Sequence, residues 1–129
     1  MVGIASWPGY AGGILANRGL KENVESIYYK KYGLPVRFAL VEDPDALSKA
    51  FVKGGPEGID ILWTTVDSWA IQSASFKDQG IDGRAFIQVD WSRGGDALVA
   101  DKNIKSVEDL KGKKIALVQY TPSHWLLET

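Results

Sequence analysis

Short apolar runs alternate along the chain with longer stretches in which apolar residues recur at helical spacing. The short runs have the length and composition of β-strands, and the longer stretches have the pattern of amphipathic helices. Strands are predicted at 2–6, 36–40, 59–63, 84–90 and 115–118. Because strands and helices take turns throughout, the sequence predicts an α/β fold with a mostly parallel sheet flanked by helices.

The helical stretches are bounded by residues that commonly start or end helices. A helix is predicted over 20–33, ending at Gly33, with an apolar stripe formed by Leu20, Val24, Ile27, Tyr28 and Tyr32. Asp43 followed by Pro44 predicts the start of another helix, and Asp67 or Ser68 is expected to cap the next one. Further helical segments are predicted at 11–16, at 106–109 as a single capped turn, and from 121 onward.

The segment after the last predicted strand has the features of a helix N-terminus. Thr121 is expected to be the N-cap, and Pro122 sets the first helical φ angle. The backbone N–H groups of Ser123, His124 and Trp125 are then expected to be open, beside the hydroxyls of Thr121 and Ser123, which is a geometry that binds anions. The alternative is that Thr-Pro-Ser is only a good capping sequence.

Three predicted turns follow strands and lead into helices, at 7–10, 64–68 and 121–124. In open α/β sheets, ligands bind beyond the carboxyl ends of the strands, so these turns are expected to converge on one cleft. Gly9, Gly12 and Gly13 are expected to let a ligand or a neighbouring element approach the backbone. A plain turn beneath a packed tryptophan is the alternative there, and simple helix capping is the alternative for Asp67.

Composition narrows the functional classes. The chain of 129 residues has a net charge of −1, which does not favour binding to nucleic acid or to an anionic membrane. It contains no cysteine and one histidine, so we expect no disulfide, no metal site and no cofactor. No apolar run approaches membrane-spanning length, and we expect either that the protein has no signal peptide or that one has been removed.

The common enzymatic signatures do not occur in this sequence. There is no dinucleotide fingerprint, no phosphate loop and no nucleophile elbow. Ser123 and His124 are neighbours in sequence, which does not make a catalytic triad, and a capping or ligand-donor role is favoured for His124. We therefore expect no catalytic residue and no enzymatic activity.

Five segments, at 6–10, 65–68, 94–100, 106–116 and 121–124, together resemble the substrate-binding proteins of ABC importers for nitrate, sulfonate and taurine. These belong to a wider group that includes thiamin-pyrimidine precursor binders. The resemblance spans nearly the whole chain, and the segments keep the family's order. It implies a type II periplasmic-binding-protein-like fold, with residues 1–93 as a first lobe, 94–101 as a crossover and 102–129 as the start of an incomplete second lobe.

The resemblance also implies a set of ligand-facing residues. They are Trp7, Gly9, Tyr10, Val66, Asp67, Thr121, Ser123 and His124. Asp67 would repel a bare oxyanion, whereas a zwitterion can place its ammonium on Asp67 and its acid group on the helix N-terminus near Thr121. Trp7 and Tyr10 can stack on or cover such a ligand.

The expected partners are accordingly a small-molecule ligand and an ABC transporter permease, and the expected location is periplasmic or extracellular and membrane-anchored. Two alternatives stay open: a thiamin-pyrimidine binder or synthase, although such synthases carry a cysteine-rich motif that this chain lacks, and a ligand-sensing regulatory lobe. Because the second lobe is incomplete, residues 102–129 are expected to be ordered by self-association or by a complementing chain.

Overall fold

The computed structural model describes residues 1–91, 93, 95–119 and 121–128. It consists of two compact units, Met1–Asp90 and Trp91–Thr129, and each is described by itself below. The expected lobe, crossover and second-lobe boundaries stay predictions.

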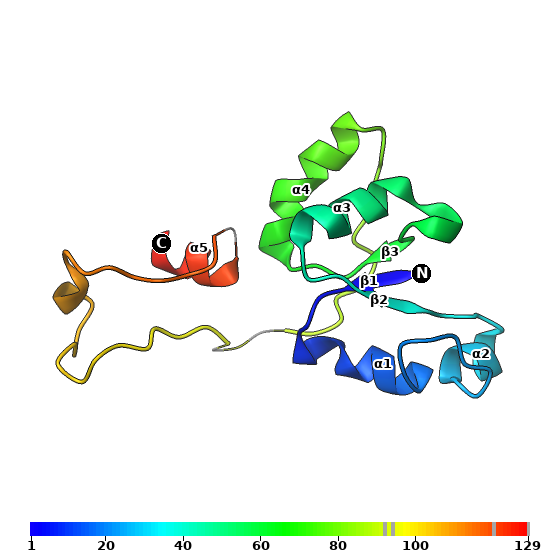
Figure 1. Cartoon of the computed structure of the whole chain (residues 1–129), viewed down its shortest axis with the longest axis horizontal. Helices are drawn as coiled ribbons and strands as arrows, with labels where there is room; N and C mark the ends of the chain where they lie inside the picture. The colour runs from blue at the N-terminus through cyan, green and yellow to red at the C-terminus, as the bar shows by residue number, and fades with distance from the viewer. Residues whose placement is uncertain (92, 94, 120, 129) are drawn as a thin grey trace. The chain divides into compact units, whose positions relative to one another are not determined.

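The first unit is built on a parallel sheet of three strands, β1 (Val2–Ile4), β2 (Phe38–Leu40) and β3 (Ile61–Leu62), in the order β2-β1-β3 (Figure 1). Val2 pairs with Phe38 on one side and Ile61 on the other, and Gly3 pairs with Ala39 and Leu62. This arrangement confirms the predicted α/β fold with a parallel sheet.

Helices cover both faces of this sheet. Figure 1 shows α1 and α2 on one face and α3 and α4 on the other. The helices are α1 (Ala11–Asn17), α2 (Ile27–Tyr32), α3 (Pro44–Lys53) and α4 (Val66–Asp78), with short 3-10 turns η1 (Pro8–Tyr10) and η2 (Gly55–Glu57). As predicted, α3 follows the cap Asp43, whose carboxylate accepts from the Ala46 N–H at 2.6 Å.

The predicted helix over 20–33 is wrong in its first half, because α2 begins only at Ile27. The buried side-chain amide of Asn17 donates to the carbonyls of Gly19, Lys21 and Val36, each at 3.0 Å. The Leu20 carbonyl accepts from the Phe38 N–H at 2.8 Å. The carbonyls that would open a helix at Leu20 therefore bind other groups, and the pattern of apolar residues does not reveal this competition.

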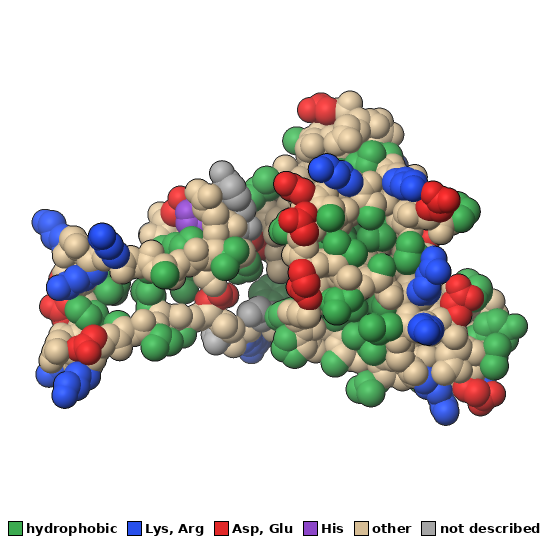
Figure 2. All heavy atoms as spheres, viewed as in Figure 1, with side chains coloured by type: hydrophobic (Ala, Val, Ile, Leu, Met, Phe, Trp, Pro, Cys, Tyr) green, Lys and Arg blue, Asp and Glu red, His purple; other side chains and the backbone are tan. Residues whose placement is uncertain are grey.

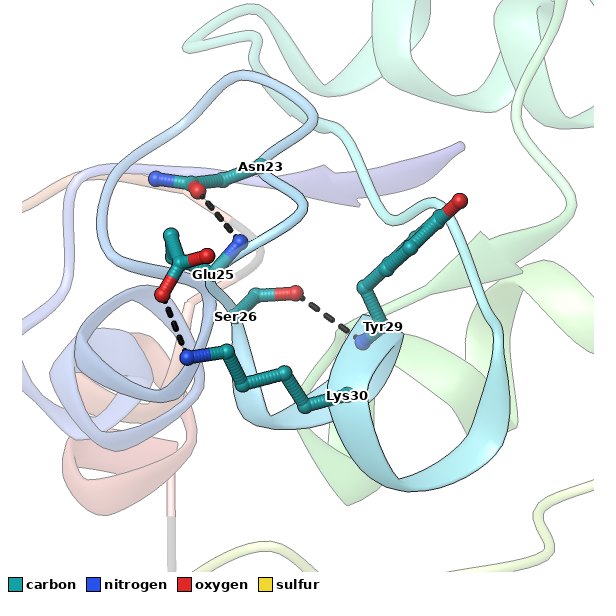
Figure 3. Close-up of polar contacts among 5 residues, drawn as sticks. All are labelled: Asn23, Glu25, Ser26, Tyr29 and Lys30. Atoms are coloured by element: carbon teal, nitrogen blue, oxygen red, sulfur yellow. Dashed lines mark hydrogen bonds and ion pairs between the residues drawn. The ribbon is translucent and has the colours of Figure 1, made fainter.

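Ser26 is the residue that starts α2. Its hydroxyl accepts from the Tyr29 N–H at 3.0 Å, and just before it Asn23 accepts from the Glu25 N–H at 2.8 Å (Figure 3). These local side-chain bonds hold a turn ahead of the helix, as asparagine and serine commonly do.

The start of α4 also differs from the prediction. Thr65 is the N-cap residue, so Asp67 and Ser68 lie inside the first turn and neither caps the helix. The Thr65 hydroxyl donates to the Ser68 hydroxyl at 2.9 Å. Because Thr65 is the N-cap, α4 begins at Val66, which is nearer in sequence to the end of β3 than the predicted start.

The core of the first unit lies between the sheet and its helices. Val2, Ile4 and Phe38 form its centre, and partly buried apolar side chains pack around them: Tyr10, Ile14, Tyr28, Val36, Ile61 and Trp63. On the α3 and α4 side, Phe76 is buried and its ring centroid lies 5.1 Å from that of Phe51. Of the predicted stripe of α2, only Tyr28 joins this core, while Leu20, Val24, Ile27 and Tyr32 are exposed.

The second unit contains η3 (Glu108–Leu110) and α5 (Pro122–Glu128). The predicted single turn forms as η3, and the Asp109 carboxylate accepts from the N–H groups of Lys105 at 2.9 Å and Ser106 at 3.1 Å. The N-cap residue is Val107, which makes no side-chain capping bond, so the prediction that Ser106 caps the turn is wrong. The predicted strands at 84–90, in the first unit, and at 115–118, in the second unit, are wrong, because neither forms a strand. A strand needs a neighbour to accept and donate its backbone hydrogen bonds, and among the described residues these runs have none.

Candidate functional site

The sheet order identifies the edge at which a ligand is expected. From β1 the chain crosses to β2 on one side, and it then returns to β3 on the other side of β1. The strand order therefore reverses between β1 and β3, and the carboxyl ends of these two strands form the topological switch point where open α/β sheets bind ligands. The turn that follows β1 contains Trp7, Gly9 and Tyr10, and the turn that follows β3 leads to Val66 and Asp67.

Aromatic rings gather at this edge. The ring centroids of Trp7 and Tyr10 lie 5.8 Å apart in an edge-to-face contact, and those of Tyr10 and Trp63 lie 5.1 Å apart. Trp63 also meets Phe38 of the core at 5.6 Å. Trp63 was not among the predicted site residues, and its position as the last residue of the predicted strand at 59–63 was the signal that it reaches this edge.

Gly9 makes its close approach to a neighbouring segment of the chain. A Cβ placed on Gly9 would lie 2.3 Å from a carboxylate oxygen of Asp90, so a side chain at position 9 would require the Asp90 side chain to shift. Burial, together with the charge of Asp90, raises the pKa of the Tyr10 hydroxyl above its usual 10.0. Asp90 is thus a neighbour of the first turn that the sequence did not identify, because it lies far along the chain within a run that was predicted to be a strand.

Asp67 has the most unusual environment of the predicted residues. Its Oδ2 atom is buried and has no hydrogen-bond partner among the described residues. Leaving a buried carboxylate oxygen without a partner costs about 1–3 kcal/mol or more. Val66, the preceding residue, is exposed, so this pair contributes one buried carboxylate oxygen and one apolar side chain open to solvent.

Thr121, Ser123 and His124 lie together in the second unit, at the start of α5. The Thr121 carbonyl accepts from the N–H groups of His124 at 2.9 Å and Trp125 at 3.2 Å, so the expectation that these two N–H groups are open is wrong. The Thr121 hydroxyl donates to the Val118 carbonyl at 2.7 Å. The first turn of α5 closes on itself in the ordinary helical way, and this leaves fewer donors for an acid group than the sequence suggested.

Two carboxylates, those of Asp96 and Glu128, lie close to residues of this turn. The Ser123 hydroxyl donates to the Asp96 carboxylate, and His124 Nε2 lies 3.3 Å from a Glu128 carboxylate oxygen. Thr121 and Ser123 also line a cavity of about 280 Å³ whose other walls are mainly apolar, including Leu98, Leu117 and Leu126. These carboxylates oppose an anion at this turn, since a bound acid group would have to displace Asp96 from Ser123.

The eight predicted ligand-facing residues therefore fall into two groups. Trp7, Gly9, Tyr10, Val66 and Asp67 belong to the first unit, and Thr121, Ser123 and His124 belong to the second. Within residues 1–91, 93, 95–119 and 121–128, no cluster of histidine and acidic side chains is arranged to hold a metal ion. No helix in the same part of the chain is long and apolar enough to cross a membrane.

The chain was compared with known protein families, with curated proteins and with solved structures, and no family model, protein or structure matches it.

Proposed function

We propose that this chain binds a small polar or zwitterionic solute at the carboxyl edge of its parallel sheet, as the solute-binding component of an ABC importer, and catalyses no reaction on it. The observation that carries the proposal is the buried, unpartnered Oδ2 atom of Asp67, a residue in the first turn of the helix that follows β3. An ammonium group of the ligand would supply the missing hydrogen bond and charge partner.

The surroundings of Asp67 in the first unit support a ligand with a cationic end. Trp7 and Tyr10 follow the adjacent strand, and their rings provide faces that attract a cation. The Asp90 carboxylate lies close to Gly9 and acts on Tyr10, so it brings a second negative charge to the turn that follows β1. A bare oxyanion such as nitrate is therefore the least favoured member of the ligand class, and an amino-sulfonate or amino acid is the most favoured.

The ligand class is tested by thermal shift and calorimetry with compounds that differ by one charge. Taurine is compared with a sulfonate that lacks the amine, and an amino acid with its deaminated acid; nitrate and pyrimidines complete the panel. We expect the amine-bearing member of each pair to bind more tightly. Binding of pyrimidines alone would instead support the thiamin-pyrimidine reading, and turnover of any ligand would contradict a purely binding role.

Asp67→Asn is the matching substitution, because it keeps the shape of the side chain and removes its charge. Loss of a charged hydrogen bond should weaken binding of the amine-bearing ligand by about 1.5–3 kcal/mol. Asp45→Asn is the control, since Asp45 is likewise the second residue of a helix but is exposed on α3. Equal affinities of the wild type and Asp67→Asn for every ligand would remove the argument for an ammonium partner.

The importer assignment needs its own test. A permease gene beside the gene for this chain, and co-purification of that permease with the ligand-loaded protein, would support it. Co-purification with a kinase or a DNA-binding chain would instead support the sensory alternative.

A further inference from the structure

A groove on the α1 and α2 face of the first unit combines apolar side chains with an excess of positive charge. The groove has a volume of about 530 Å³, and Leu15 and Ile27 form part of its wall. Leu15 is 76% exposed and Ile27 is 58% exposed, and both lie in the wall of the same groove, so they form a shared apolar patch. Figure 2 shows hydrophobic side chains reaching the surface in the region that α1 and α2 occupy in Figure 1.

The charges around this groove are unequal. Arg18, Lys30 and Lys31 line it together with a single carboxylate, that of Glu25. Glu25 is already bound to the Lys30 ammonium (Figure 3), and this hydrogen bond, with a further contribution from Arg18, holds the Glu25 pKa below its usual value. The cations are thus in excess at the groove, whereas the chain as a whole carries a net charge of −1.

Arg18 ends α1 in an unusual backbone conformation. Its φ of 60° lies in the left-handed region that favours glycine, and glycine follows it at position 19. The Arg18 N–H donates to the carbonyls of Ile14 and Leu15 as α1 ends. Cations at the ends of α1 and α2 also stabilise the helix dipoles, but that role does not require an exposed leucine and isoleucine beside them.

The geometry points to a docking site for an acidic amphipathic helix of another protein, with an apolar side chain inserted between Leu15 and Ile27 and flanking carboxylates paired with Arg18, Lys30 and Lys31. Helices bind grooves through apolar anchors spaced at helical intervals, and complementary charge at the rim sets orientation and association rate. Glu25 in the wall disfavours an anionic lipid surface. The site lies on the opposite face of the sheet from α3 and α4 and does not depend on the proposed solute.

The test uses conformationally stapled helical peptides with a leucine, isoleucine or phenylalanine anchor. One set carries glutamate three and four positions on either side of the anchor, and the matched set carries lysine at the same positions. Binding to the full chain is measured by fluorescence anisotropy at low and physiological salt. We expect at least one glutamate-flanked peptide to bind about tenfold more tightly than its lysine-flanked partner, with affinity falling as salt rises.

Two groove variants and one control variant test whether the peptide binds at this groove. Ile27→Asp and Lys31→Glu should each weaken binding about tenfold or more, and Lys49→Glu on α3 should leave it unchanged. All three positions are exposed, so thermal unfolding should confirm that the variants stay folded. The proposal is overturned if no glutamate-flanked peptide outperforms its lysine-flanked partner, if the groove variants bind as the wild type does, if phosphatidylserine vesicles bind in place of the peptides, or if light scattering shows that a second copy of the chain covers this face.

Discussion

The two units of this chain contain similar apolar runs, but among the described residues only those of the first unit form a sheet. In β1, Ile4 is 1% exposed, and the strand is bonded on both sides: the Val41 N–H donates to the Ile4 carbonyl at 2.9 Å, and the Trp63 N–H donates to the Gly3 carbonyl at 3.0 Å. In the run 115–118 of the second unit, Val118 is 71% exposed and no strand forms. An apolar run thus becomes a buried strand only when neighbouring segments supply its hydrogen bonds and cover its faces.

The two units also differ in how their predicted ligand-facing residues are supported. The groups at the switch point of the first unit are positioned by a core, whereas none of the described residues from 91 to 128 is buried. The prediction that residues 102–129 are ordered by self-association or by a complementing chain therefore stays a prediction.

The largest expected difference between the units is in the effect of core truncation. Ile4→Ala should lower the free energy of unfolding by about 2–5 kcal/mol, because it leaves a cavity between the sheet and its helices. Val118→Ala should change it by less than about 0.5 kcal/mol, as is usual for exposed positions. Urea denaturation of both variants measures the two effects. A large effect of Val118→Ala that depends on protein concentration would show that the second unit is packed in an assembly.

The next effect compares two adjacent glycines of α1. A Cβ on Gly13 would lie 2.4 Å from Cη2 of Trp63, whose ring is held by Tyr10 and Phe38, so Gly13→Ala should cost about 1–3 kcal/mol of stability. A Cβ on Gly12 would meet no atom within 4 Å, so Gly12→Ala should stabilise the protein by about 0.5–1 kcal/mol. Thermal unfolding of the pair measures the difference. Similar effects of both substitutions would show that the Trp63 ring does not pack against Gly13.

A smaller difference is expected between the side-chain-to-backbone bonds at the helical turns of the two units. Ser26→Ala should lower stability by about 1 kcal/mol, since the Tyr29 N–H loses its acceptor in a buried position. Asp109→Ala removes two such bonds but should leave the global unfolding transition unchanged, because η3 lies outside the core of the first unit. Amide hydrogen exchange should show faster exchange at Lys105 and Ser106 in this variant. A shift of the global transition with Asp109→Ala would mean that the two units unfold together.

The smallest expected effect links Asp90 to the turn after β1. Asp90→Asn should lower the Tyr10 pKa only part of the way towards 10.0, because burial is the larger cause of its increase and remains. Since the raised pKa favours the neutral phenol in the folded state, the corresponding stability is present below pH 10.0 and is lost as pH rises through the folded-state pKa. Nuclear magnetic resonance of ring-labelled tyrosine follows this titration. An unchanged Tyr10 pKa in Asp90→Asn would show that the Asp90 carboxylate does not lie near Tyr10.

Local features of the sequence predicted much of the first unit. The α/β class, the position of β1, and α3 with its Asp43 cap follow from short apolar runs and from capping residues, which act within a few positions of the chain. The turn in which the Asp109 carboxylate accepts from the Ser106 N–H is local in the same way. The turn that carries Trp7, Gly9 and Tyr10 was predictable for this reason too, because Pro8 fixes the φ angle of the first residue of η1.

Tertiary contacts decided the rest. The start of α2 depends on Asn17, which binds carbonyls that a helix from Leu20 would use, and the environment of Gly9 depends on Asp90, which is distant in sequence. The unpartnered Asp67 oxygen and the exposed wall of Leu15 and Ile27 are likewise properties of packing. Spacing along the chain specifies which residues can share a face, but it does not specify which segment covers that face, because hydrogen bonding and burial join residues that sequence proximity does not relate.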